Sequence, residues 1–516
     1  MLVRAYRPEW GMPMSSAPEP LLAATQRQLL HRVASEQADA RAPSLVAAVA
    51  RDGQTVWSAG RGRAVGPARA PADDIGGGAA PGAGTADGGG RVTLGEAGRP
   101  GPDTQYRIGS ITKTFTAVLV LRLRDEGRLS LADPLDRHVP GTAVGDSTIA
   151  QLLAHLGGIT AETPPPWWER VAGSEHATLD EAVGPDPRRF RPGRRHHYSN
   201  VGFAVLGELV ARLRGMSWAQ ALDRELLAPL GLTRTTGAPM APHAQGYAVH
   251  PHADVLLPEP AHDAGVMAPA GQLWSTVTDL VRWMAVLGGH SDAVLSLDTL
   301  AEMREPAAVE ADSGEWQLGA GLGLQLIRRP NGLGGPSGQR GPAGTSTVFV
   351  GHGGSMPGFV AAAWSRPGGT AAVALSNATS GVAVGELTLD LIDSVDALQP
   401  SLPTEWLPGP LVDGDTLDVT GVWYWGPAPY IVTLRGDGTL VLTPQGRYGR
   451  ASRLRPGPAA GTWTGLDGYF AGETLVLGRD ASGRLTNLEL ASFVFTRRPY
   501  APADRIPGGV DPHGWQ

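Results

Sequence analysis

The sequence predicts an α+β domain followed by a small all-β domain. Strand-like segments lie at both ends of a long, mostly helical middle, and a Pro-rich linker with a second set of short strands follows. Strands that flank a helical middle are expected to share one sheet against which the helices pack. A chain of 516 residues also exceeds one ordinary hydrophobic core. The expected organisation is an N-terminal extension (1–24), a main domain (25–399) with a flexible Gly-rich insertion (66–90), the linker (400–410), a β domain (411–500) and a C-terminal tail (501–516).

The main domain is expected to open with a helix and a hairpin. Residues 21–40 follow two prolines and predict a helix, and residues 44–50 and 54–58 predict strands. Arg51-Asp52-Gly53 between the strands is a hairpin turn signal. The insertion is rich in Gly, Ala, Pro and Asp, a composition that predicts no packed structure of its own.

The later elements follow from the same patterns. An apolar helix begins at Ser110 and ends near Glu126, before the stop signal Gly127. Further helices are expected at 149–155, 201–213, 218–227, 278–287 and 382–395, and strands at 323–327, 347–350, 360–364 and 370–375. After the linker, runs such as 430–434, 440–443, 474–477 and 485–490 predict an antiparallel barrel or sandwich.

Composition excludes several classes of function. The net charge of −7 gives no basic surface for nucleic acid, and the absence of cysteine excludes thiol chemistry and disulfides. The first residues lack the apolar run of a signal peptide, and no apolar stretch is long enough to cross a bilayer. We therefore expect a cytoplasmic protein that does not contact membranes. No metal or cofactor is expected, because nothing completes a site around His250, His252 and Asp254, and no phosphate loop or dinucleotide fingerprint occurs.

Ser110 and Lys113 predict a nucleophile and its base. Lys113 is the only lysine among 43 Lys and Arg residues, so the chain uses arginine wherever a positive charge alone is needed. An amine can lose its proton inside a protein, whereas a guanidinium effectively cannot. The spacing i to i+3 places both side chains on one helix face, and the start of that helix favours a serine oxyanion. The alternatives are a helix cap for Ser110 and a solvated charge for Lys113.

Two later motifs supply possible partners for this pair. Tyr198 and Asn200 precede a helix, so a Tyr198 phenolate could accept the Ser110 proton while Asn200 holds a substrate amide. The alternative is a core tyrosine and a helix-capping asparagine. Gly351-His352-Gly353-Gly354-Ser355 follows an expected strand, where glycines let a substrate approach closely. The N–H of Ser355 could complete an oxyanion hole, and His352 could bind a substrate carboxylate or relay protons, unless it is simply a turn histidine.

Three motifs in this order resemble the serine hydrolases related to class C β-lactamases: Ser110-x-x-Lys113, Tyr198-x-Asn200 and His352-x-Gly354. This family includes D-Ala-D-Ala carboxypeptidases, D-aminopeptidases and β-lactamase-like esterases. Residues 131–135, 151–158 and 269–276 are similar to the family too, so the resemblance covers roughly residues 25–395. It implies a serine β-lactamase/DD-peptidase-like fold, with a helical subdomain beside a central antiparallel sheet flanked by helices. It also implies that Ser110 is acylated, with Lys113 and Tyr198 sharing the role of general base.

The expected function is hydrolysis of an ester or amide, in a D-residue peptide, an ester or a β-lactam-like compound, through an acyl-Ser110 intermediate. The substrate would be a small molecule or a peptide. One alternative is a thioesterase or peptide cyclase of the penicillin-binding-protein type, which transfers the acyl group to an amine. Another is a non-catalytic binding protein on the same scaffold. Secreted class C enzymes usually carry Lys-Thr-Gly where this chain has His352-Gly353-Gly354, which makes antibiotic defence an unfavoured function.

The C-terminal domain resembles the small lipocalin-like barrels appended to some members of this family. Its aromatic residues either line a groove or, as we consider more consistent with a barrel, pack in its core. These residues are Trp423, Tyr424, Trp425, Tyr430, Trp463 and Tyr469.

Overall fold

The computed structural model describes residues 18–65, 98–310, 317–330, 346–379, 381–402, 405–409, 414–446 and 449–500. The chain divides into two compact units at residues 401 and 402. The Gly-rich insertion at 66–90, the tail at 501–516 and most of the N-terminal extension lie outside the described residues.

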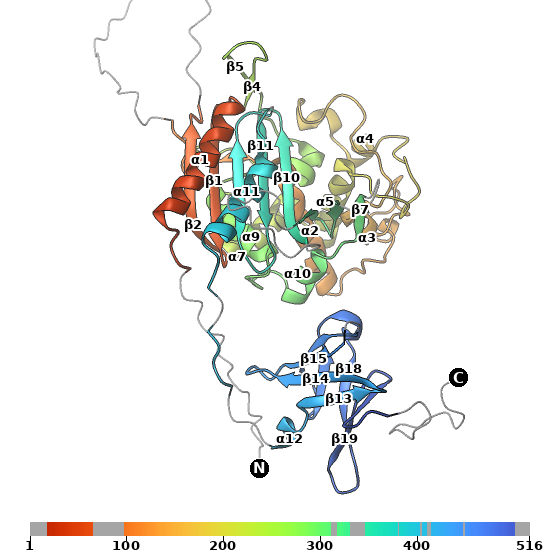
Figure 1. The fold of residues 1–516 in the computed structure, drawn as a ribbon. Coiled ribbons are helices and arrows are strands. Elements are labelled where there is room, and N and C mark those ends of the chain that lie inside the picture. The colour runs from red at the N-terminus through yellow and green to blue at the C-terminus, as the bar shows by residue number, and fades with distance from the viewer. Residues whose placement is uncertain are drawn as a thin grey trace, which may run out of the picture. The chain divides into compact units, whose positions relative to one another are not determined.

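An eight-stranded antiparallel sheet forms the centre of the first unit (Figure 1). Its order is β2 (Gln54–Gly62), β1 (Ser44–Arg51), β12 (Ala371–Ser376), β11 (Phe359–Ser365), β10 (Ser346–Met356), β9 (Gln325–Pro330), β8 (Leu318–Ala320) and β7 (Ala308–Glu310). The expected hairpin of β1 and β2 turns at Asp52 and Gly53, whose φ angles of 49° and 74° fit a two-residue hairpin turn. The hairpin pairs with β12, where Leu45 lies opposite Ser376. Strands from both ends of the domain therefore share one sheet, as predicted.

Helices cover both faces of this sheet. On one face α1 (Ala23–Asp39) and α11 (Val384–Leu398) lie side by side and bury Leu29, Val33 and Ile392 in a common core (Figure 1). On the other face α9 (Val277–Leu287) packs on β1, β11 and β12. The expected flanked sheet is confirmed.

The helical subdomain lies beside the sheet and is built around two apolar helices, α2 (Thr112–Asp125) and α5 (Asn200–Arg214) (Figure 1). Nearly every residue of α2 is buried. Its other helices are α3 (Ile149–Leu153), α4 (Leu179–Val183), α6 (Trp218–Leu222), α7 (Ala228–Leu230), α8 (Ala268–Gly271) and α10 (Leu297–Met303). Short strand pairs join β3 (Tyr106–Arg107) to β6 (Trp274–Ser275) and β4 (Tyr247–Val249) to β5 (Leu256–Pro258). Single 3-10 or π turns occur at η1 (Gly109–Ile111), η2 (Leu135–Arg137), η3 (Gly173–His176), η4 (Asp223–Leu227) and η5 (Gly265–Met267).

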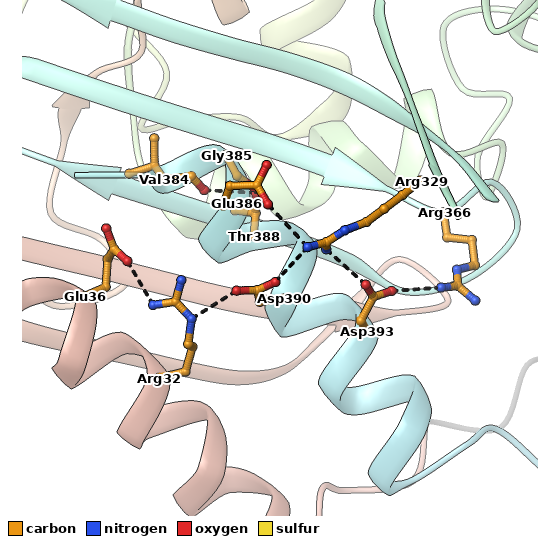
Figure 2. Close-up of polar contacts among 10 residues, drawn as sticks. All are labelled: Arg32, Glu36, Arg329, Arg366, Val384, Gly385, Glu386, Thr388, Asp390 and Asp393. Atoms are coloured by element: carbon orange, nitrogen blue, oxygen red, sulfur yellow. Dashed lines mark hydrogen bonds and ion pairs between the residues drawn. The ribbon is translucent and has the colours of Figure 1, made fainter. Parts of the chain in front are cut away.

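An ion-pair network fastens α11 to the sheet and to α1. Figure 2 shows Arg329, on β9, reaching Glu386, Asp390 and Asp393 of α11, at 3.3, 3.1 and 3.0 Å. Arg32 of α1 pairs with Asp390, and Arg366 after β11 pairs with Asp393. Three acidic side chains of one helix are thus neutralised from three different elements.

The second unit is a closed barrel of eight antiparallel strands, which settles the choice between barrel and sandwich. The strands are β13 (Gly421–Trp425), β14 (Ala428–Leu434), β15 (Leu440–Pro444), β16 (Ser452–Pro456), β17 (Thr462–Gly465), β18 (Thr474–Arg479), β19 (Leu485–Leu490) and β20 (Phe493–Thr496), with α12 (Gly414–Leu417) before them and η6 (Gly468–Phe470) after β17. Trp423, Tyr430 and Trp463 are buried in the barrel core, whereas Tyr469 is exposed. The aromatic residues therefore divide between core and surface.

Candidate active site

Ser110 lies in η1, the short turn that leads into α2. The Ile108 N–H donates to the Leu273 carbonyl at 2.9 Å, and Gly109 has a φ of +49° that favours glycine. The Ser110 side chain stays partly exposed, although its neighbours Gly109 and Ile111 are buried. The local sequence therefore presents a reachable hydroxyl at the start of a buried helix.

Lys113 is fully buried one turn further along α2. Its Nζ lies 2.8 Å from Ser110 Oγ, and it donates to Asn200 Oδ1 and to the Ala270 carbonyl, both at 2.7 Å. Burial lowers the pKa of Lys113 to about 7, against an opposing pull from Glu162 and Glu169. A substantial fraction of the amine is therefore neutral near pH 7 and able to accept a proton.

Tyr198 lies close to both Ser110 and Lys113. The Ser110 side chain lies near enough to the tyrosine hydroxyl to oppose the effect of burial on the Tyr198 pKa, and Lys113 Nζ lies 5.0 Å from the ring centre. His155 packs against the Tyr198 ring at 4.3 Å between centroids and accepts the Ser199 N–H. Burial raises the pKa of Tyr198 above its ordinary value, so the residue is a neutral phenol at pH 7.

Asn200 begins α5 and contacts protein groups at both ends of its amide. Its Oδ1 accepts from Lys113, and its Nδ2 donates to Glu162 Oε1 at 2.7 Å. Asn200 is also buried. In this structure the Asn200 side chain therefore orients the lysine, and its contact with a substrate amide stays a prediction.

Strand β10 passes directly against the turn that carries Ser110. A methyl group on Gly354 would overlap the Ile108 carbonyl oxygen, and one on Gly109 would lie 2.6 Å from the Ser355 nitrogen. The two glycines thus allow the backbone around Ser110 and Ser355 to approach closely, and the predicted oxyanion hole needs such an approach. The expectation that 351–355 follow a strand is corrected, because these residues lie within β10 and pair with β11.

His352, on β10, lies next to Tyr198 and is almost fully buried. Its Nδ1 hydrogen-bonds to the Gly353 carbonyl, and its ring centre lies 6.1 Å from that of Tyr198. Burial lowers the pKa of His352 to about 3, so the ring is neutral at pH 7. A neutral ring offers a hydrogen bond rather than a full charge, so carboxylate binding and proton relay by His352 both stay predictions.

The sequence did not reveal two glutamates beside Lys113. Glu162 accepts from Asn200 and from Trp168 Nε1, both at 2.7 Å. Burial, with a smaller effect of the neighbouring Glu162 charge, raises the pKa of Glu169 to about 7. Both residues lie on the loop before η3, and their only sequence signal is acidic residues around a Pro-Pro-Pro-Trp-Trp run.

No group of three or more His, Cys, Asp or Glu side chains in the described ranges is placed to hold a metal ion. Asp254 instead pairs with Arg41 at 2.8 Å. No helix in these ranges is both long enough and apolar enough to span a bilayer.

The first unit has the β-lactamase/transpeptidase-like fold. A penicillin-binding protein homologue from Pyrococcus abyssi superposes with a TM-score of 0.54 over 91% of this chain and 99% of its own, at 21% identity. A class C β-lactamase superposes with a TM-score of 0.54 over 73% of this chain and 99% of its own, at 17% identity. The β-lactamase family profile matches residues 29–397, and the chain belongs to this family.

The chain is also similar to other proteins. A D-stereospecific amidohydrolase from a Streptomyces species is 26% identical, with a TM-score of 0.53 over 72% of this chain and 98% of its own. Beta-lactamase-like protein 2 from Dictyostelium discoideum is 27% identical over 224 residues, which are 41% of this chain and 40% of that relative. The chain thus spans less than two thirds of this relative's length. Residues 412–497 match a domain of unknown function, DUF7586.

Proposed function

We propose that this protein is a serine hydrolase that cleaves an amide or ester through a covalent acyl-Ser110 intermediate. The observation that carries the proposal is the contact between Lys113 Nζ and Ser110 Oγ at 2.8 Å, at a buried amine whose pKa is lowered to about 7. A lysine that serves only as a solvated charge is expected at the surface, not buried beside an accessible hydroxyl. A protein that only binds a ligand needs no activated nucleophile.

In the proposed reaction neutral Lys113 accepts the Ser110 proton as Oγ attacks the substrate carbonyl. The N–H groups of Ser110 and Ser355 stabilise the oxyanion. The leaving amine or alkoxide takes a proton from the Tyr198 hydroxyl, which Lys113 reprotonates. Water then attacks the acyl-Ser110 ester, and the acid and regenerated Ser110 complete the cycle. The pKa directions favour Lys113, rather than a Tyr198 phenolate, as the base in the resting enzyme.

The preferred substrate class is an amide of a D-amino acid or D-residue peptide. This choice is supported by the 26% identity to an amidohydrolase whose own specificity is described as D-stereospecific. Because His352 is neutral, it offers no positive charge to a carboxylate of the substrate. Substrates that need such a charge at this position are therefore disfavoured. Transfer of the acyl group to an amine uses the same acyl-enzyme and differs only in the acceptor.

The test begins with intact-mass spectrometry after exposure to a fluorophosphonate. A single adduct on Ser110, absent from Ser110→Ala, is expected, and equal labelling of that variant would contradict the proposal. Matched D- and L-amino acid p-nitroanilides, p-nitrophenyl esters and nitrocefin then define the substrate. Added amines separate hydrolysis from transfer, because only a transferase diverts the acyl group into a new amide.

A further inference from the structure

A row of four hydrogen bonds joins Trp168 to the candidate nucleophile. Trp168 Nε1 and Asn200 Nδ2 donate to the two oxygens of Glu162, each at 2.7 Å. Lys113 Nζ donates to Asn200 Oδ1 at 2.7 Å and lies 2.8 Å from Ser110 Oγ. Glu162 therefore connects Trp168, at the outer end of this row, to Asn200 and through it to Lys113 and Ser110.

The carboxylate of Glu162 determines which way the Asn200 amide points. An ionised carboxylate only accepts hydrogen bonds, so the group of Asn200 that faces it must be the NH2. The carbonyl oxygen of Asn200 must then face Lys113. A reversed amide would place two acceptors together at Glu162 and present an N–H to Lys113, where it would compete with Ser110 for the lysine lone pair.

The direction of that amide matters because a neutral lysine amine has two N–H bonds and one lone pair. Asn200 Oδ1 and the Ala270 carbonyl, each at 2.7 Å, accept the two N–H bonds. The third contact of Nζ is Ser110. We propose that Glu162 is a positioning residue that fixes the amide of Asn200 and thereby directs the lone pair of Lys113 at the Ser110 hydroxyl. This inference rests on the proposed function, in which Lys113 is the base.

Glu162 also acts on Lys113 through its charge, and Glu169 offers a matched comparison. Both carboxylates raise the pKa of Lys113 against the larger effect of burial. The other titratable groups that face Lys113 are Tyr198, His155 and His352, all uncharged near pH 7 because burial disfavours their ionised forms. The side chain of Glu169 interacts with Trp167, whereas the carboxylate that accepts from Asn200 is that of Glu162. Glu169→Gln therefore removes a nearby charge without releasing the amide.

The first experiment measures the rate of fluorophosphonate labelling of the full chain from pH 5 to 9. In Glu162→Gln the rate on the alkaline plateau, where Lys113 is already neutral, is expected to fall about tenfold or more, as part of the contribution of a general base. In Glu169→Gln the plateau is expected to stay within about twofold of wild type, since only charge is lost. A Glu162→Gln plateau within twofold of wild type, or an equal loss in both variants, overturns the inference.

The second experiment reads Lys113 directly and needs no substrate. Because the chain has a single lysine, [13C]lysine labelling gives one ε-CH2 signal whose titration reports the pKa of Lys113. Glu162→Gln is expected to lower that pKa relative to wild type. An unchanged titration shows that Glu162 does not reach Lys113 and overturns the inference. If wild-type Ser110 is not labelled, the proposed function fails instead, and this titration still decides whether the Glu162 carboxylate acts on Lys113.

Discussion

Gly354 lies directly against the backbone of Ile108, so close that a side chain on it would overlap the Ile108 carbonyl oxygen. The same imagined methyl group would lie 3.2 Å from the Ser110 nitrogen. β10 can therefore lie this close to the turn that carries Ser110 only because Gly354 has no Cβ atom. This spacing also sets the distance between the two N–H groups proposed to receive the oxyanion.

Gly354→Ala is expected to lower turnover by about a hundredfold or more, because it moves β10 away and disrupts the oxyanion site. Gly353→Ala is the matched control, since a methyl group there would meet Gln325 Oε1 at an ordinary 3.7 Å. Steady-state kinetics of both variants and their melting temperatures make the comparison. Similar activity in the two variants would refute the role of this close approach.

Lys113→Arg is expected to lower turnover by at least about a hundredfold, because the positive charge remains but the base is lost. The measurement is kcat of the purified variant, with Ser110→Ala defining the background rate. Activity close to wild type would mean that Lys113 contributes only its charge.

Acylation should depend on pH with an inflection near 7. Below this pH Lys113 is protonated, so kcat/KM is expected to fall about tenfold per pH unit as the pH decreases. The raised pKa of Tyr198 places its ionisation far above this range. Glu169 also titrates near 7, so the profile of Glu169→Gln must retain the inflection. A flat wild-type profile between pH 5 and 9 would argue against Lys113 as the base.

The buried lysine should also make stability depend on pH. Its folded-state pKa is about 7 and its ordinary value is 10.5, so between these values the unfolded chain binds more protons than the folded chain. The wild type is therefore expected to gain up to about 1.4 kcal/mol of unfolding free energy per pH unit above 7, relative to Lys113→Met. Urea unfolding of both proteins at pH 6 to 9 measures this difference. Parallel stability profiles would contradict the shifted pKa.

Arg329→Ala should destabilise the first unit by about 1–2 kcal/mol, because three acidic residues of α11 lose a shared partner. The loss should shrink in high salt, which screens such partly exposed pairs. Arg128→Ala is the control, since this exposed arginine has only a longer-range charge interaction with Glu126 among the described residues. Equal melting temperatures for the two variants would show that the network adds nothing.

Local patterns predicted much of the fold and part of the site. The hairpin of β1 and β2 and the Ser110–Lys113 pair depend on neighbouring residues, which periodicity and turn chemistry report directly. Glu162 was not found, because its contact with Asn200 joins a loop to a helix that begins 38 residues later. The strand character of 351–355 was also missed, since glycines ordinarily weaken a strand and only pairing with β11 keeps them in one.

The pairing of β1 with β12 places a constraint on how the protein is made. Ala47 lies opposite Ala374, so the middle of the sheet joins segments more than three hundred residues apart. During synthesis the edge of β1 that pairs with β12 stays unpaired until nearly the whole first unit has left the ribosome. An exposed edge of apolar residues invites pairing with another chain, and long-range pairing is slow. Production of the soluble protein is therefore expected to be limited by assembly of the sheet and to improve with chaperones or a lower growth temperature.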